Sequence, residues 1–187
     1  EQTAPFGAWP SPISASMVAA GAAPLSQVAL DGADCYWLVG RASEAGRTTL
    51  MRQRGGTVSE ITPAPFNVRS RVHEYGGGAS LVAGGVAYFS HFADNRLYVA
   101  ADGAAPAPLT APGAKRYADF VIDRARSRLV SVREDHSAGG AYPVNTVCAV
   151  GFDGSETVLV EGADFYAAPR VSPDGRSLAW LSWDHPH

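Results

Sequence analysis

The densest run of chemically capable residues lies at positions 69–78, RSRVHEYGGG. Glu74 could hold a substrate ammonium and Arg69 or Arg71 a carboxylate, in each case through charge-assisted hydrogen bonds. The three glycines permit positive φ and allow another segment to approach closely. The alternative is an internal Arg–Glu network that fixes the crossing between two structural units. The candidate substrate-binding residues are Arg71, His73, Glu74 and Tyr75.

Other chemistries lack their motifs. The Gly-x-Ser-x-Gly nucleophile elbow does not occur, and His136-Ser137 followed by Gly139-Gly140 is too local for a triad. The histidines never show HExxH or another metal-ligand spacing, and the glycine run lacks the further residues of a dinucleotide or phosphate loop. We therefore expect no catalytic residue, no metal and no cofactor in these 187 residues.

Composition narrows the class of protein. Hydrophobic residues make up 46% and charged residues 18%, which excludes a disordered polyelectrolyte, and a net charge of −3 offers no footprint for nucleic acid. The apolar stretch 13–25 imitates a signal-peptide core, but the first basic residue is Arg41, and no run approaches a membrane span. Cys35 and Cys148 are expected as buried free thiols. The expectation is a cytoplasmic protein without nucleic-acid or membrane partners.

Internal repeats indicate the architecture that must position these residues. An apolar run, a tight turn and a stronger apolar run recur at 28–40, 80–90, 120–132 and 170–182. A third and a fourth apolar run follow each of the first three segments. Four short antiparallel strands in every 40–50 residues are typical of a propeller blade, whereas a β-sandwich would not give this recurrence. The predicted class is all-β, a β-propeller of four-stranded antiparallel blades.

The predicted blades do not complete a ring. They cover about 9–62, 79–110 and 117–162, with the start of a fourth at about 167–187, an incomplete arc of about three and a half blades. A short helix is expected near 14–20, capped by Ser14 and ended by Gly21. An open arc exposes an apolar blade face at each end. We therefore expect either a larger ring or self-association through the open faces.

Propeller topology sends two kinds of connection to one face of the arc. The loops between blades and those between second and third strands carry all five histidines, many acids and several aromatic residues; they are 69–78, 90–95, 112–119, 133–136, 162–169 and 183–187. The opposite face receives compact turns. The loop face is therefore the binding-site candidate, and the alternative is a merely solvated polar surface. Trp180 is expected in the core and Trp183 near the loop face.

At these residues the sequence resembles a known family. The segments are WPSPIS (9–14), PFNVRSRVHEYGGGA (65–79), RYAD (116–119), REDH (133–136), PVNTV (143–147) and GADFYAAPRVSPDGRSLAWLSWDHP (162–186). Together they resemble the amino-terminal propeller of the prolyl oligopeptidase family of serine peptidases. The branch that looks most similar is the bacterial acylaminoacyl-peptidase and dipeptidyl-aminopeptidase-like one. The resemblance runs along essentially the whole chain.

The resemblance implies a larger protein. Family members join a propeller to a carboxy-terminal α/β-hydrolase domain that carries a Ser-Asp-His triad, and the propeller caps the cleft and admits short peptides. This chain contains no such domain, so peptidase activity carries over to a parent protein, with the hydrolase domain and a short peptide or aminoacyl substrate as partners. The alternative is a stand-alone propeller that binds partners and catalyses nothing. A lectin-like propeller would want the same loop motif in every blade, which this chain lacks.

Overall fold

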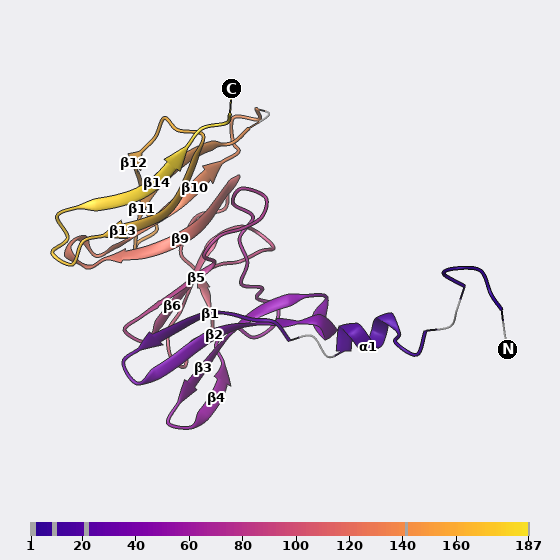
Figure 1. Ribbon diagram of the computed structural model, residues 1–187. Helices are drawn as coiled ribbons and strands as arrows, with labels where there is room; N and C mark the ends of the chain where they lie inside the picture. Colours follow the sequence, from indigo (N-terminus) through magenta and orange to yellow (C-terminus); the bar gives the residue numbers. More distant parts are fainter. Residues whose placement is uncertain (1–2, 9–10, 21–22, 141, 187) are drawn as a thin grey trace.

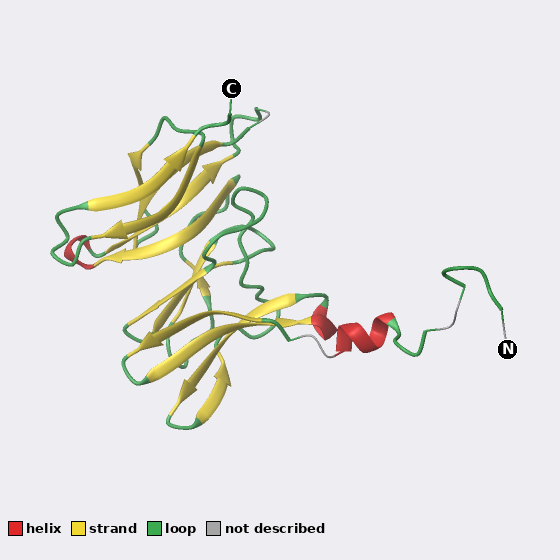
Figure 2. Cartoon of the chain, viewed as in Figure 1, coloured by secondary structure: helices red, strands yellow, loops and turns green. Residues whose placement is uncertain are grey.

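The structure is a computed structural model that describes residues 3–8, 11–20, 23–140 and 142–186, and these residues form an almost purely β fold (Figures 1 and 2). Three four-stranded antiparallel sheets and one two-stranded sheet follow one another along the chain, each in sequence order. We name them blade one, blade two, blade three and the start of blade four. They form an open arc, so the predicted fold class is confirmed.

The strands are short and evenly distributed among the blades. Blade one contains β1 (Leu25–Asp31), β2 (Asp34–Arg41), β3 (Arg47–Arg54) and β4 (Thr57–Glu60), and blade two contains β5 (Ser80–Ala83), β6 (Val86–Ser90), β7 (Leu97–Ala100) and β8 (Ala107–Pro108). Blade three contains β9 (Lys115–Asp123), β10 (Arg128–Asp135), β11 (Val144–Gly151) and β12 (Glu156–Val160), and blade four begins with β13 (Phe165–Val171) and β14 (Leu178–Trp183).

Local sequence explains why each blade forms. In β2 the side chains of Tyr36 and Leu38 are buried while their neighbours are partly exposed, the alternation of a sheet with one covered face. Most of β10 and β11 is buried on both faces, because blade three lies between two other sheets. The β5–β6 hairpin turns at Gly84 and Gly85, both with positive φ, as a two-residue hairpin loop requires.

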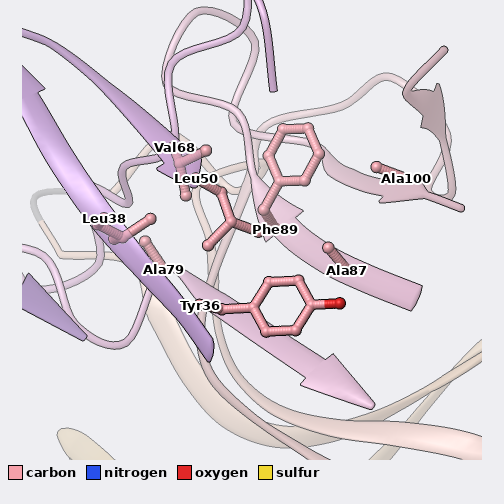
Figure 3. Close-up of a cluster of buried hydrophobic side chains, with 8 residues drawn as sticks. All are labelled: Tyr36, Leu38, Leu50, Val68, Ala79, Ala87, Phe89 and Ala100. Carbon is pink, nitrogen blue, oxygen red and sulfur yellow. The ribbon is translucent and has the colours of Figure 1, made fainter. Parts of the chain in front are cut away.

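The core lies between the blades. Blades one and two enclose a first cluster, in which Tyr36, Leu38 and Leu50 face Ala87 and Phe89 (Figure 3). A second cluster joins blades two and three through Leu97, Tyr117 and Leu129, and a third joins blade three to Tyr166 of β13. Because each core needs two sheets, the blades support one another in series and hold their loops at fixed positions.

The two ends of the arc leave apolar side chains uncovered. On β1 the side chains of Val28 and Leu30 are exposed, and on β14 Leu181 is exposed. Trp180, expected in the core, is 38% exposed. The prediction was wrong for this chain because β14 is the last strand of its sheet and pairs on one side only, with β13.

The segment before blade one carries the short helix expected there, α1 (Ala15–Ala20). The Ser14 hydroxyl accepts a hydrogen bond from the Met17 N–H at 3.1 Å, which confirms the expected cap, whereas Gly21 lies outside the described residues. Single 3₁₀ turns, η1 (Ala42–Glu44) and η2 (Arg124–Arg126), join neighbouring strands. In the described part of the chain, no helix has the length and hydropathy needed to cross a bilayer.

Both cysteines are free thiols in the structure. Cys148 of β11 is fully buried, and burial raises the pKa of its thiol to about 12. Cys35 of β2 is only half-buried, so the expectation of two buried thiols holds for one of them. A thiol with so high a pKa stays protonated near neutral pH and packs as a small apolar side chain.

Candidate substrate cavity on the loop face

A cavity of about 450 Å³ opens between segment 69–77 and strands β1, β2 and β3 of blade one. Its walls combine residues of β1, β2 and β3 with this segment and two residues from blades two and three. The charged and aromatic side chains among them are Arg69, Arg71, Glu74, Tyr75, Phe92 and Arg116. Three of the four predicted site residues, Arg71, Glu74 and Tyr75, therefore meet at one cavity, and His73 does not line it.

Arg69 and Arg71 share one aromatic contact. Their guanidinium carbons lie 4.5 and 4.1 Å from the centre of the Phe92 ring. Within the described residues, neither side chain forms an ion pair, so their positive charges are not neutralised by a neighbouring carboxylate. A cation over a ring face gains electrostatic stabilisation without using its N–H donors, which remain available to a ligand.

Glu74 belongs to an ion-pair chain that crosses from the connection between blades one and two to blade three. Its Oε1 accepts a hydrogen bond from Arg116 Nη1 at 2.6 Å, and the same nitrogen lies 3.5 Å from Glu134 Oε2. Arg116 also donates to the Arg71 carbonyl at 3.0 Å. The Glu74 side chain is 81% exposed, whereas that of Glu134 is 3% exposed. The internal Arg–Glu network that the sequence left as an alternative therefore exists at Glu74.

His73 points away from the cavity into the junction of blades three and four. Its side chain is 5% exposed, its Nε2–H donates to the Tyr166 carbonyl at 2.9 Å, and its Nδ1 lies 3.4 Å from Glu134 Oε1. The backbone N–H of His73 donates to the same carboxylate oxygen at 2.6 Å. These contacts clamp the segment between two blades, and His73 positions its neighbours at the cavity.

The contacts between His73 and Glu134 shift the pKa of both side chains. Burial alone would lower the pKa of His73, but the Glu134 carboxylate 3.4 Å from its Nδ1 and the hydrogen bond to the Tyr166 carbonyl raise it above its ordinary value. Burial alone would raise the pKa of Glu134, but the hydrogen bonds from His73 and His136 and the charge of Arg116 lower it. Both shifts favour the charged pair.

The backbone of the segment is unusual at consecutive residues. His73 and Glu74 have φ of 55° and 63°, in the left-handed region that few residues other than glycine adopt. The turn is held by the Gly76 N–H, which donates to the Val72 carbonyl at 2.8 Å, and by the contacts of His73. Such strain persists only where the surroundings fix it. Here it turns Glu74 and Tyr75 outward, while His73 is buried.

Two of the three glycines are explained by the close approach of Ala118 and Asp119, and the third by its backbone conformation. Only Gly76 has a positive φ, and a Cβ on Gly77 or Gly78 would lie within 3.1 Å of atoms of Ala118 or Asp119. Asp119 accepts a hydrogen bond from the Gly78 N–H at 2.6 Å and one from the Ala168 N–H at 2.9 Å. One carboxylate therefore joins blades two, three and four, and the glycines let the backbone reach it.

Tyr75 stands at the edge of the cavity. Its side chain is 79% exposed, and its ring centre lies 5.7 Å from that of His73, which packs in turn on Phe165 and Trp183. Trp183 therefore lies among the loop-face aromatics, where the sequence places it. The stacked rings of Phe165 and Trp183, 5.4 Å apart, connect this edge to blade four.

The other histidines have separate surroundings. His136 lies 3.2 Å from Glu134, behind the clamp, and His185 contacts Asp164 at 2.9 Å. His91 is buried and accepts a hydrogen bond from the Asn67 N–H, so it supports the loop and does not present a ring at the surface. His187 lies outside the described residues. Within the described ranges, no group of three or more His, Cys, Asp or Glu side chains has the arrangement of a metal site.

Sequence reasoning missed four residues of this region. Phe92 and Arg116 line the cavity, while Asp119 and Glu134 hold the segment in place. The signal that pointed to three of them was their position in RYAD and REDH on the loop face. Nothing in the sequence showed which of these polar groups contact segment 69–78, because the partners lie about 40 to 60 residues farther along the chain.

Comparison with known proteins finds relatives among solved structures. A puromycin-hydrolyzing peptidase of Mycobacterium tuberculosis is 38% identical with a TM-score of 0.86, and puromycin hydrolase is 38% identical with a TM-score of 0.85. Both matches cover 100% of this chain and 32% of the other. The resemblance to the amino-terminal propeller of the prolyl oligopeptidase family is confirmed. The propeller segment thus spans about a third of the length of these peptidases.

Two further solved structures also match the chain. A mutant of puromycin hydrolase complexed with PGG is 39% identical over 98% of this chain and 31% of the other, with a TM-score of 0.85. TolB from Acinetobacter baumannii is 14% identical over 87% of the propeller segment and 38% of TolB, with a TM-score of 0.55, and this likeness concerns the fold alone. No family model and no curated protein matches the chain.

Proposed function

We propose that the chain is the substrate-admitting propeller segment of a serine peptidase or related amide hydrolase that cleaves short peptides or aminoacyl amides. The observation that carries this proposal is the 38% identity over 100% of the chain to a puromycin-hydrolyzing peptidase. In the proposal the chain has no catalytic residue of its own, and a carboxy-terminal α/β-hydrolase domain supplies the triad. The cytoplasmic location and the acylaminoacyl-peptidase-like branch stay predictions.

The role proposed for the cavity is recognition of one end of the substrate. Support comes from its position on the loop face and from its side chains, two arginines without ion pairs, an exposed carboxylate and an exposed tyrosine. Arg71 and Tyr75 are the proposed contact residues, Glu74 lines the cavity with its carboxylate held by Arg116, and His73 positions the segment. The size of the opening limits substrates in this proposal without any reactive group.

The experiment is a comparison of two preparations. The full-length protein is assayed with aminoacyl and dipeptidyl anilides, next to the purified 187-residue chain. We expect turnover by the first that a serine-reactive inhibitor abolishes, and none by the second. Turnover by the purified chain, or a full-length protein that cleaves no amide, would refute the proposal.

A second candidate is a stand-alone propeller that binds partners on its loop face. The exposed apolar strands at both ends of the arc, Val28 and Leu30 on β1 and Leu181 on β14, favour it if they close against a second copy. The gene sequence beyond His187 separates the two candidates. A Gly-x-Ser-x-Gly segment a few hundred residues downstream supports the peptidase, whereas a stop codon immediately after His187 supports the stand-alone propeller.

A further inference from the structure

The side chains of the cavity carry more positive than negative charge. Three guanidinium groups, those of Arg69, Arg71 and Arg116, line it together with one carboxylate, that of Glu74. Arg116 already neutralises Glu74 at 2.6 Å, which leaves the charges of Arg69 and Arg71 in excess. We infer that the cavity binds a carboxylate, specifically the terminal carboxylate of a short peptide. This inference rests on the proposed function for the kind of ligand.

The two arginines are prepared for such a ligand. The Phe92 ring supports both guanidinium groups, at 4.5 and 4.1 Å from its centre, without accepting a strong hydrogen bond from either. Each guanidinium has five N–H donors in a fixed fork that matches the two oxygens of a carboxylate. Because the ring already restricts the two side chains, less conformational entropy is lost when a ligand orders them.

The cavity disfavours a ligand that carries an ammonium group. Glu74 is the only carboxylate that lines the cavity within the described residues, and it is engaged by Arg116, which Glu134 also contacts at 3.5 Å. A substrate ammonium would have to displace Arg116 from Glu74 and would then lie near two further arginines. Like charges at these separations repel, so the same groups that attract a carboxylate disfavour an amino terminus.

The cavity has the size for one end of a peptide. Its volume of about 450 Å³ lies within the ~300–1,000 Å³ range of small-molecule sites. The exposed Tyr75 ring at its edge offers an apolar surface to the residue before the carboxylate. The cavity thus fits the terminal carboxylate of a peptide together with the side chain of its last residue.

The test measures binding to the full-length protein by calorimetry with three probes, while chromatography follows any product. The probes are N-acetyl-Ala-Ala, its carboxy-terminal amide, and N-acetyl-Glu-Ala amide, whose only carboxylate is on a side chain. We expect the first to bind at least about tenfold tighter than the second, because a charged hydrogen-bonded pair is lost in the amide. Equal affinity for the first two probes, or no binding of either, overturns the inference. Equal affinity for the first and third overturns the assignment to a terminal carboxylate.

Variants locate the site. Arg69→Gln and Arg71→Gln should each weaken N-acetyl-Ala-Ala about tenfold and leave the amide unchanged, whereas Glu74→Gln should keep or increase the affinity for the acid. Arg124→Gln is the matched control, since Arg124 is exposed in the β9–β10 turn and makes no side-chain ion pair among the described residues. Undiminished binding by both cavity variants overturns the inference, and so does loss of binding in Glu74→Gln with retained folding.

The two hypotheses fail differently. If the acid probe binds selectively but the protein cleaves no peptide or anilide, the carboxylate site stands and the proposed peptidase function is wrong. If the protein cleaves anilides but binds the acid and amide probes equally, the peptidase function stands and the carboxylate site is wrong. Circular dichroism of each variant shows whether a lost affinity reflects a lost fold.

Discussion

Arginines on the two faces of the arc have different surroundings. On the turn face, Arg52 and Arg54 of blade one both reach Asp102 in the β7–β8 turn of blade two, and Arg126 and Arg128 both reach Asp123. On the loop face, Arg69 and Arg71 lie over Phe92, and neither forms an ion pair within the described residues. Arg52 and Arg54 therefore join two blades on the turn face, whereas Arg69 and Arg71 on the loop face are left available beside Arg116, which pairs with Glu74 and Glu134.

This difference shows which side chains hold the blades together on each face and which remain available to a ligand. Turn-face contacts cross from one blade to the next, as where Arg126 donates to the Gly175 carbonyl at 2.8 Å and the Gly85 N–H donates to Asp31 at 2.6 Å. On the loop face, segment 69–78 is held by the carboxylates of Asp119 and Glu134, which accept backbone N–H groups, and by Arg116, which pairs with Glu74. Because those carboxylates hold the backbone, the arginines of segment 69–78 do not have to.

The strongest way to break this comparison is to remove the carboxylate that joins three blades. Asp119→Ala deletes the acceptor of the Gly78 and Ala168 N–H groups and places alanine at a φ of 57°. Two charged hydrogen bonds are lost, so we expect a destabilisation of about 3 kcal/mol. The measurement is the unfolding midpoint together with amide exchange at Gly78 and Ala168, which should accelerate most.

Asp119→Asn is the control for that change. Asparagine tolerates the left-handed region and keeps one acceptor oxygen, so it should recover about half of the lost stability. If alanine and wild type protect the two amides equally, the carboxylate is not what joins the blades, and the division of labour on the loop face is wrong.

Much of the fold could be predicted because each blade is encoded by a local sequence pattern that recurs along the chain. The recurrence of apolar runs and tight turns gave the order of the strands and the antiparallel sheets, as in the hairpin at Gly84–Gly85. Trp180 was placed wrongly because β14 is the edge strand of a two-stranded sheet, and no pattern within residues 170–182 reveals that its side chains are left uncovered. Periodicity shows which face of a strand is apolar, and not whether another sheet covers it.

The sequence predicted the position of the candidate site better than it predicted the role of each residue in it. Residue types marked segment 69–78, and three of the four predicted site residues, Arg71, Glu74 and Tyr75, do line one cavity. The sequence did not separate His73 from Glu74, although a left-handed turn buries one side chain and exposes the next. Nor did it show Phe92 beneath the two arginines, because that contact joins separate loops whose distance in space depends on the packing of whole blades.

A smaller effect should appear in the pH dependence of stability. The pKa of His73 is raised in the folded state, so its contribution is complete below the ordinary unfolded value of about 6.5 and is lost as pH rises through the folded pKa. The wild-type unfolding midpoint should therefore fall as pH rises over this range by more than that of His73→Asn, in which asparagine tolerates the positive φ. The difference between the two slopes is the quantity to measure.

Glu134 gives the matching check at acid pH. Its pKa is lowered, so its contribution is present above the ordinary unfolded value of about 4.3 and is lost as pH falls through the folded pKa. Glu134→Gln should flatten that acid limb and also remove the extra slope of His73. Parallel slopes in wild type and His73→Asn would contradict the clamp and leave His73 free for another role.

The smallest effect on peptide affinity is expected on the turn face and sharpens the comparison most directly. Arg54→Gln is the same chemical change as Arg71→Gln, but Arg54 pairs with the exposed Asp102 and with the buried Asp34. The exposed pair contributes little, and Arg52 still reaches Asp102, so the unfolding midpoint should fall only through the loss of the pair with Asp34, and the affinity for N-acetyl-Ala-Ala should not change measurably. Arg71→Gln should also keep the fold but lose affinity about tenfold. If Arg54→Gln weakens the peptide as much as Arg71→Gln does, the arginines act through overall charge and not through a cavity on one face.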